Sequence, residues 1–339
     1  MKKKEIFPIK YSAIKINKTR EGKITNKIIY SNYLYKKDIK KKFVLIKVQY
    51  ANINYKDFLM FKNIRGLIKR FPHTPGIDAS GIVYFSNSKK FKKNDKIFII
   101  AKPLGVELNG SFSQFISVPD HWVNKLPKNL TSKETMMIGT SGFTAIKALN
   151  ETLKTILNNK HKPVLVTGAS GNVGTFLIHL LKSYKISVEA ISSNKGNERI
   201  LKKIGVSKTH SLKNFLNAPN FSMLNEKYSV IFENLGGSLI SICLKYLIKG
   251  GILVSIGNIL SNTSTINILP LILRNVSIIG INAEYSNAYE RKKIFQIFNS
   301  IKFKKKLLKK TKVISLKEVC KILSKKNYNK RNKRLVVKI

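Results

Sequence analysis

The chain has 339 residues, a length that predicts two domains, and 43% of them are hydrophobic, which excludes wholesale disorder. Lys and Arg number 64 against 17 Asp and Glu, so the formal net charge is +47. Only eight of the basic residues are Arg, on which base-reading nucleic-acid proteins depend, so we expect solvated lysine-rich faces and no specific nucleic-acid partner.

The first third of the chain has the pattern of a β-rich domain. Short runs of apolar and β-branched residues alternate with turns rich in proline and glycine, such as those near Pro72 and Pro103. The predicted strands are residues 44–50, 81–85, 96–101 and 111–118. A helical region is predicted to begin at Ser132.

From about residue 135 strands alternate with helices, which predicts a parallel sheet with right-handed crossovers. The predicted strands are residues 163–167, 186–192, 228–232, 251–256 and 276–281, and the predicted helices are 172–184, 198–204 and 238–248. Two more helices, 289–303 and 316–323, and a last strand, 335–338, complete the predicted elements. The fold class is therefore α/β, with a doubly wound parallel sheet after a β-rich domain.

The cysteines and the apolar runs limit the compartment. Cys243 and Cys320 are too few for a disulfide framework or a four-cysteine zinc lobe, and they fit a reducing environment. No apolar run reaches the ~18 residues that a bilayer requires, and no signal-peptide core follows the basic first residues. We therefore expect a cytoplasmic protein that does not enter a membrane.

A glycine-rich turn, Gly168-Ala169-Ser170-Gly171-Asn172-Val173-Gly174, follows the strand at 163–167 and precedes a helix. Glycines permit a tight turn and let the backbone approach a pyrophosphate, and the helix N-terminus presents free N–H groups. A tight turn without a ligand can have the same glycines, but the strand before and the helix after predict dinucleotide binding. The expected contacts are Ser170, Gly171, Asn172 and Val173.

The tip of the second strand predicts which dinucleotide is bound. An NAD site places Asp or Glu at that tip for the ribose 2′-OH. Here the tip reads Ser192-Ser193-Asn194-Lys195, and Glu189 lies too early, inside the strand. Two hydroxyls, an amide and a cation suit a 2′-phosphate, so the predicted cofactor is NADPH, with contacts from Ser192, Ser193 and Asn194.

The order of motifs resembles the zinc-free, quinone oxidoreductase-like branch of the medium-chain dehydrogenase/reductase superfamily, and more closely its NADPH-dependent acryloyl-CoA (acrylyl-CoA) reductase family. The resemblance covers nearly the whole chain. Its matching segments are Asn54-Tyr55-Lys56-Asp57, Pro75-Gly76-Ile77-Asp78, Met137-Ile138-Gly139-Thr140, Leu273-Arg274-Asn275-Val276 and Arg334-Leu335-Val336-Val337-Lys338. The resemblance implies a GroES-like substrate domain over residues 1–134, completed by 288–339, a Rossmann domain over 135–287, and a homodimer.

The resemblance also indicates that no metal is used. Zinc alcohol dehydrogenases of the superfamily have a Cys where Asn54 stands and a His where Ile77 stands, and neither replacement is a plausible Zn²⁺ ligand. Without a Lewis acid, the expected chemistry is hydride addition to an activated C=C bond. The family's usual Arg at the second strand tip is Asn194 here.

Reduction of an enoyl thioester requires a donor for the thioester oxygen and a proton for the α-carbon. By resemblance, Asn54, Tyr55 and Asp57 lie in a loop that faces the nicotinamide. We expect Tyr55 to contact nicotinamide or substrate, Asn54 to donate to the oxyanion, and Asp57 to orient the loop. A packing role for Tyr55 and proton delivery by water remain open alternatives. His73, near two prolines, is predicted to be a turn residue.

Further cofactor contacts are predicted at strand ends, where ligands of doubly wound sheets bind. Asn258 and Ala283 follow predicted strands, Thr140 opens a helix near the nicotinamide half, and the resemblance adds Ile272 and Asn329. The predicted function is NADPH-dependent reduction of acryloyl-CoA to propionyl-CoA, and the alternative is an NADPH:quinone oxidoreductase. No residue separates these two substrates. A catalytically silent nucleotide-binding or nucleic-acid-binding protein would rest on the charge alone.

Overall fold

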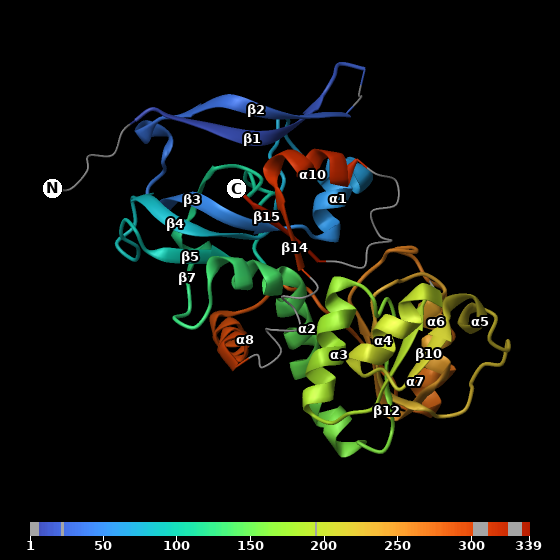
Figure 1. The fold of residues 1–339 in the computed structure, drawn as a ribbon. Coiled ribbons are helices and arrows are strands. Elements are labelled where there is room, and N and C mark those ends of the chain that lie inside the picture. The colour runs from blue at the N-terminus through green and yellow to red at the C-terminus, as the bar shows by residue number, and fades with distance from the viewer. Residues whose placement is uncertain (1–6, 22–23, 194, 301–310, 325–333) are drawn as a thin grey trace. The chain divides into compact units, whose positions relative to one another are not determined.

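The computed structural model describes residues 7–21, 24–193, 195–300, 311–324 and 334–339 (Figure 1). The chain divides into two compact units. The first unit is Met1–Thr140 with Phe295–Ile339, and the second is Ser141–Ile294. No helix in the described ranges is long and apolar enough to cross a membrane.

The first unit contains a hairpin and a seven-stranded sheet. The hairpin pairs β1 (Ile9–Lys18) with β2 (Ile24–Leu34). The sheet has the order β14-β15-β3-β4-β5-β7, with β6 paired to β3. Its strands are β3 (Phe43–Asn52), β4 (Ala79–Ser86), β5 (Lys96–Ile99), β6 (Phe115–Pro119), β7 (Asn124–Lys125), β14 (Thr311–Ser315) and β15 (Arg334–Lys338). The helices α1 (Tyr55–Phe61) and α10 (Leu316–Leu323) belong to the same unit.

The C-terminal strands complete the core of this unit. β15 pairs antiparallel with the end of β3, where Val336 lies opposite Asn52. Buried side chains of β15, α1 and α10 form one apolar cluster, in which Val337, Met60 and Leu323 are fully buried. Because β3 leads directly into α1, this pairing fixes the loop between them.

The strands β1, β2 and β14 of this unit were not predicted from the sequence. The hairpin β1–β2 lies in a Lys- and Asn-rich stretch, yet Ile14 and Ile16 are fully buried in the core and Lys15 between them is almost as buried. β14 is similar, since only Ile314 of its five residues is buried. In β1 lysines interrupt the apolar residues along the sequence, and in β14 a single residue is buried, so neither strand shows a clear alternation.

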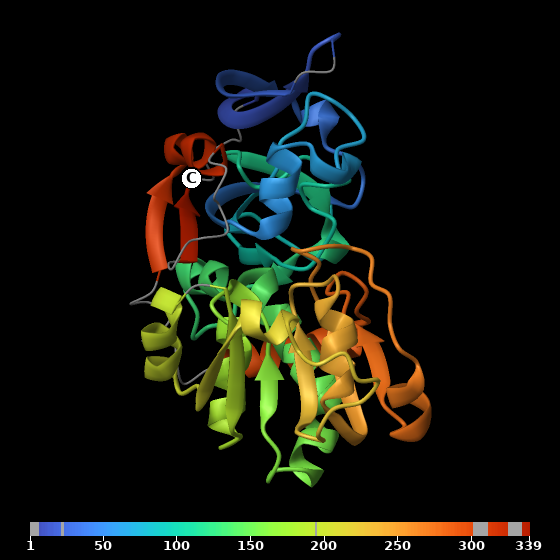
Figure 2. The ribbon, with the colours of Figure 1, turned by 90° about the vertical axis from the view of Figure 1, so that its right-hand side faces the viewer.

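The second unit is built around a six-stranded parallel sheet, with strands in the order β10-β9-β8-β11-β12-β13 (Figure 2). The strands are β8 (Val164–Val166), β9 (Val188–Ser192), β10 (Lys208–Ser211), β11 (Tyr228–Glu233), β12 (Leu247–Ser255) and β13 (Ser277–Gly280). The helices that lie partly or wholly in this unit are α2 (Ser132–Asn158), α3 (Asn172–Ser183), α4 (Glu198–Ile204), α5 (Leu212–Leu216), α6 (Leu239–Lys245), α7 (Leu269–Leu273) and α8 (Ala288–Ser300). The first strand of this unit, β8, lies in the middle of the sheet. The next two strands, β9 and β10, are added on one side of it and the later strands on the other side. The position beside β8 where the strand order changes side is where doubly wound sheets bind dinucleotides.

The alternation predicted for this unit is confirmed, with shifted boundaries at one helix. The predicted helix 238–248 ends at Lys245, because β12 already begins at Leu247 and continues through Gly250 and Gly251. Gly250 has a positive φ of 67°, and the pairing of β11 with β12 changes register nearby. The short elements β10 and α5 were not predicted. The expected C-cap Gly205 is confirmed, with a φ of 101°.

Candidate active site

The loop that joins β3 to α1 is held by reciprocal hydrogen bonds. Asn54 is the N-cap of α1, and its side chain accepts the backbone N–H of Asp57. In return, the Asp57 Oδ2 atom accepts the backbone N–H of Asn54 at 2.8 Å, and Oδ1 accepts that of Ile77 at 3.1 Å. This capping box fixes the start of the helix, so Tyr55 occupies its first turn.

Asp78 joins three separate segments of the first unit. Its Oδ2 atom accepts hydrogen bonds from Asn54 Nδ2 at 2.9 Å, Asn52 Nδ2 at 3.3 Å and the backbone N–H of Thr140 at 2.8 Å. Its Oδ1 atom accepts the Thr140 hydroxyl. Asp78 therefore fixes the orientation of two predicted site residues, Asn54 and Thr140. The sequence analysis quoted Asp78 in a motif but gave it no role.

Thr140 follows a break in α2 at Gly139. Gly139 has φ 55° and ψ −167°, a conformation that is essentially restricted to glycine. A Cβ atom there would also lie 2.7 Å from Asp78 Oδ2. The carbonyls of Met137 and Ile138, next to the break, accept hydrogen bonds from the buried Arg334 guanidinium. Backbone groups on both sides of the break therefore have hydrogen-bond partners: Arg334 donates to the carbonyls before it, and Asp78 accepts the N–H of Thr140 after it.

Asp57 and Asp78 form a pair of fully buried carboxyl groups. Burial raises the pKa of Asp57 to about 7, against the opposing effect of the N–H of Asn54, and the neighbouring Asp78 raises it further. Burial also raises the pKa of Asp78, although its hydrogen bonds from Thr140, Asn54 and Asn52 oppose this effect. All of these hydrogen-bond donors are neutral and none of them is a cation, so burial favours the protonated form of both carboxyl groups.

Tyr55 differs from its neighbours in having an uncommitted polar group. Its ring is half-buried and stacks on Phe58, with 6.0 Å between the ring centroids and 23° between their planes. Asn54, by contrast, uses its amide toward Asp57 and Asp78. The contacts of the described residues include no hydrogen bond to the Tyr55 hydroxyl, so this group can donate to a ligand.

Two further positions of the first unit are structural. His73 is buried, its Nε2 atom lies 2.7 Å from the Gly105 carbonyl oxygen, and its backbone pairs with Ile16. Burial lowers the pKa of His73, so the ring is held in the neutral form. Ile77 is buried in the apolar cluster around α1. Over the described part of the chain, no three His, Cys, Asp or Glu residues gather as a metal site.

The glycine turn in the second unit has the geometry of a phosphate cradle. Gly168 leaves β8 with a φ of 55°, and Gly171 is the N-cap of α3. A Cβ atom on Gly174 would lie 2.7 Å from the Gly168 carbonyl oxygen, so α3 can approach the turn only because Gly174 has no side chain. The N-terminus of α3 therefore directly follows the turn, and a helix N-terminus supplies the N–H donors that a pyrophosphate requires.

Residues at and just after the end of β11 form hydrogen bonds with Thr167, which lies between β8 and this turn. The Glu233 Oε1 atom accepts the Thr167 hydroxyl at 3.0 Å, and Oε2 accepts the Gly236 N–H at 2.8 Å. Asn234 donates to the Thr167 carbonyl oxygen at 2.8 Å. Sequence analysis missed Glu233 and Asn234, because their importance comes from the parallel pairing of β8 with β11 and not from a motif.

At the tip of β9, Ser192 is buried and Ser193 is exposed, and Asn194 lies outside the described residues. A short 3₁₀ turn, Lys195–Asn197, follows. Its last residue, Asn197, is buried and donates from Nδ2 to Ser170 Oγ at 3.1 Å and to Ser192 Oγ at 3.5 Å. The predicted residues of the glycine turn and of the strand tip are thus brought together by a residue that the sequence analysis did not name.

Of the four remaining predicted cofactor residues, two follow strand ends, one lies on an exposed helix and one lies outside the described residues. Asn258 and Ala283 are half-buried and follow the carboxyl ends of β12 and β13, as predicted. Ile272 lies on α7 with 65% of its surface exposed. Asn329 lies outside the described residues. The roles of all four stay predictions.

Comparison with known proteins identifies the family. The family model of the alcohol dehydrogenase GroES-like domain matches residues 40–128, and that of the zinc-binding dehydrogenase matches residues 172–298. The Bacillus subtilis protein named "Putative quinone oxidoreductase YhfP" is 33% identical over 248 residues, 73% of this chain and 75% of that protein. The chain belongs to the quinone oxidoreductase-like branch of the medium-chain dehydrogenase/reductase superfamily. As a member of this family, it is an oxidoreductase.

Other members of the superfamily are similar over comparable lengths. Acrylyl-CoA reductase AcuI of Ruegeria pomeroyi is 29% identical over 254 residues, 73% of this chain and 77% of that protein. The structure of Bacillus subtilis yhfP with NAD bound has a TM-score of 0.88 at 28% identity, and the match covers 98% of this chain and 100% of that one. The yhdH oxidoreductase from Salmonella enterica in complex with NADP has a TM-score of 0.89 at 24% identity, covering 97% and 99%. The predicted fold class, a Rossmann domain with a GroES-like domain, is confirmed.

Proposed function

We propose that this oxidoreductase is an NADPH-dependent reductase of activated C=C bonds, and that acryloyl-CoA, reduced to propionyl-CoA, is its substrate. The observation that carries this proposal is the loop of Asn54 to Asp57, where a capping box presents a Tyr55 hydroxyl that has no hydrogen-bond partner among the described residues. Similarity to acrylyl-CoA reductase AcuI of Ruegeria pomeroyi supports the substrate. Similarity to the protein named as a quinone oxidoreductase supports the alternative, a quinone.

The second unit fits a dinucleotide cofactor. The glycine turn at Gly168 to Gly174 leaves no room for a Cβ atom at its last glycine, so α3 packs closely against the turn and its N-terminus lies where a pyrophosphate binds in such folds. The strand tip carries Ser192 and Ser193 and no carboxylate, which favours NADPH. Bound NADP in the yhdH structure supports this choice, whereas the yhfP structure has NAD bound. NADPH, when bound, supplies the hydride.

The residues of the first unit act on the substrate's carbonyl group. A neutral donor at Tyr55 can stabilise the negative charge that develops on a thioester oxygen. Asn54 contributes by holding the loop, since its amide already bonds to Asp78 and to the N–H of Asp57. We therefore assign oxyanion donation to Tyr55 before Asn54, and loop orientation to Asp57.

We propose further that the reaction needs no metal. Where zinc enzymes of the superfamily have Cys and His, this chain has an amide that is engaged in a capping box, Asn54, and an apolar residue packed in the core, Ile77. Hydride addition to an activated alkene needs no Lewis acid. Activity that disappears on chelation and returns with Zn²⁺ would contradict this proposal.

The deciding experiment measures NADPH oxidation with acryloyl-CoA, crotonyl-CoA and a benzoquinone side by side, with propionyl-CoA detected by mass spectrometry. We expect the highest kcat/KM for acryloyl-CoA. A higher value for the quinone would favour the alternative, and no oxidation with any substrate would contradict both. Tyr55→Phe should lower kcat about tenfold or more with little change in the Kd of NADPH, because it removes one donor from the reacting oxygen.

We also propose that the protein is a cytoplasmic homodimer. β13 is an edge strand of the parallel sheet, and its Ile278 is 39% exposed. Ile268, which precedes α7, and Ile272 and Leu273 on α7 are each more than half exposed. An unpaired edge strand beside an apolar patch is a surface that a second copy of the chain can cover. Free cysteines at 243 and 320 support a reducing compartment.

A further inference from the structure

Asn197 connects the two loops of the second unit that the cofactor is proposed to contact. It ends the 3₁₀ turn after β9, and only 7% of its surface is exposed. Its Nδ2 atom donates to Ser170 Oγ, in the glycine turn after β8, at 3.1 Å. The same atom lies 3.5 Å from Ser192 Oγ, at the tip of β9. One amide group therefore fixes the turn and the strand tip together.

The other atom of this amide is unsatisfied. Asn197 Oδ1 is buried and has no hydrogen-bond partner among the described residues. A buried acceptor without a partner costs about 1–3 kcal/mol, and most such groups in proteins have a partner. This cost indicates that the position of Asn197 is selected by something other than the stability of the two loops. A ligand that uses these loops is the simplest such reason.

The direction of the hydrogen bond between Asn197 and Ser170 determines whether the Ser170 hydroxyl can still donate to a ligand. A hydroxyl that accepts from an amide N–H keeps its own hydrogen for another acceptor. Ser170 is exposed, so this hydrogen is accessible to a ligand. A 2′-phosphate at neutral pH offers mostly charged acceptor oxygens, and a hydrogen bond to a charged oxygen is stronger than one to the neutral oxygen of a ribose 2′-OH. The arrangement favours the phosphate.

A carboxylate in the place of this amide would have the opposite effect. Because a carboxylate only accepts hydrogen bonds, it would draw the Ser170 hydrogen toward itself. It would also repel a 2′-phosphate and accept a ribose hydroxyl, as the acidic residue of NAD sites does. The difference between Asn and Asp at this one position therefore separates the two cofactors by both hydrogen bonding and charge.

We propose that Asn197 is the positioning residue that sets the preference for NADPH over NADH, by orienting the Ser170 hydroxyl toward the 2′-phosphate. This inference rests on the proposed function, because it assumes that the second unit binds a nicotinamide dinucleotide. It adds a specificity residue that lies outside the glycine turn and beyond the tip of β9.

The first test measures binding, not turnover. Kd values for NADPH, NADH, 2′,5′-ADP and 5′-AMP are obtained by calorimetry for the wild type and for Asn197→Asp. We expect the variant to bind NADPH and 2′,5′-ADP about tenfold more weakly or worse, and NADH and 5′-AMP within about threefold of the wild type. Asn217→Asp, an exposed position of the same unit, is the control for the change in net charge and should alter none of the four values by more than about twofold.

The second test asks whether Asn197 acts through Ser170, and it stays informative if Asn197→Asp does not fold. In a double-mutant cycle, Ser170→Ala and Asn197→Ala should each reduce the preference for 2′,5′-ADP over 5′-AMP, and Asn197→Ala should add little in the Ser170→Ala background. Fully additive effects, or an unchanged preference in folded Asn197→Asp, would overturn the inference. Failure of the wild type to bind either dinucleotide would overturn the proposed function itself.

Discussion

At the scale of single residues, the two buried carboxyl groups of the first unit should make the stability of the fold depend on pH. Asp57 has a pKa of about 7 in the folded chain, against 3.8 for an ordinary Asp, so the folded state retains its proton over the range between them. The contribution of Asp57 to stability is therefore fully present below pH 3.8 and is lost as the pH rises toward 7. Asp78 has a raised pKa and acts in the same direction.

Asp78→Asn should weaken this pH dependence. The substitution removes one buried charge that raises the pKa of Asp57, and it keeps an oxygen for the donors Asn52, Asn54 and Thr140. Between pH 4 and pH 7 the variant should lose at least about 1 kcal/mol less of its unfolding free energy than the wild type. Urea unfolding at several pH values measures the difference, and superimposable pH profiles would refute the coupling between the two carboxyls.

Glu189 should show the reverse dependence. Burial raises its pKa, but hydrogen bonds from Lys227, His210 and Tyr228 outweigh burial and hold the pKa below the usual 4.5. Stability from this cluster is therefore present above pH 4.5 and lost as the pH falls below it. Glu189→Gln should lower the unfolding free energy by about 2 kcal/mol at pH 7, with a smaller effect near pH 4. An equal cost at both values would mean that the charge of Glu189 contributes nothing.

Individual site residues could be predicted from the sequence, but their hydrogen-bond partners could not. Asn54, Tyr55 and Asp57 could be predicted because they are adjacent in one motif. Asp78 reaches Thr140, which is 62 positions away, and Asn197 reaches Ser170 across 27. Such contacts depend on which strands become neighbours, and no local pattern encodes that. For the same reason Glu189, too early for a cofactor contact, proved to be the centre of a hydrogen-bonded cluster.

At the scale of elements, the break in α2 at Gly139 is the feature most sensitive to sequence. Gly139→Ala combines a backbone conformation that only glycine adopts readily with a close approach to Asp78. We expect a loss of about 3 kcal/mol or more of unfolding free energy. Gly250→Ala is the matched control, because Gly250 has a φ of 67° but nothing within 4 Å of a Cβ atom. It should cost about 1 kcal/mol. Equal costs for the two variants would exclude the close approach as a cause.

Helices and strands whose apolar residues recur at regular spacing could be predicted from the sequence. Those in which polar residues interrupt the apolar ones could not. α4 and α10 lie where they were predicted, because apolar residues recur at helical spacing and the ends carry capping residues. Ser315 and Glu318, for example, form a capping box at the start of α10. The hairpin β1–β2 was not predicted, because lysines interrupt its apolar residues along the sequence, and Lys15 is one of them although it is buried. Abundant lysine thus obscures the alternation on which strand prediction depends.

At the scale of the whole molecule, the apolar edge formed by α7 and β13 predicts the oligomeric state. Ile278→Lys places a charge on the edge strand, which should prevent a second copy from pairing there. Light scattering after gel filtration should give twice the chain mass of 38.5 kDa for the wild type and the single mass for the variant. Phe221→Lys, at a 67% exposed position outside this edge, should leave the dimer intact. A wild-type monomer would contradict the proposed homodimer.

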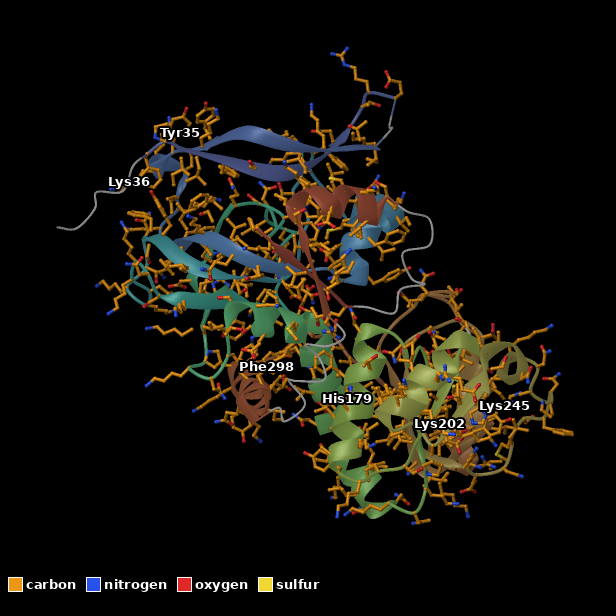
Figure 3. All side chains as sticks on the ribbon, viewed as in Figure 1. Tyr35, Lys36, His179, Lys202, Lys245 and Phe298 are labelled. Atoms are coloured by element: carbon orange, nitrogen blue, oxygen red, sulfur yellow. The ribbon has the colours of Figure 1, made fainter. Side chains whose placement is uncertain are left out.

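The positive charge is distributed unevenly between the two units. The first unit holds 45 of the 64 basic residues and 10 of the 17 acidic ones, and the second unit holds the remainder. Many of these lysines are solvated, such as Lys36 in the first unit and Lys202 in the second (Figure 3). The excess therefore lies mainly on the unit that carries Tyr55 and the proposed substrate loop. A field of this sign attracts phosphorylated ligands.

This field predicts how the rate depends on salt. A CoA thioester carries several phosphates and a quinone carries none, so electrostatic capture should favour the thioester alone. Because the Debye length falls from ~10 Å at 0.1 M salt to ~3 Å at 1 M, kcat/KM for acryloyl-CoA should decrease about tenfold or more over this range. The value for an uncharged quinone should change much less. Both must be measured at saturating NADPH, since salt also weakens binding of the cofactor. Parallel salt curves for the two substrates would show that the net charge of +47 does not assist capture and reflects composition alone.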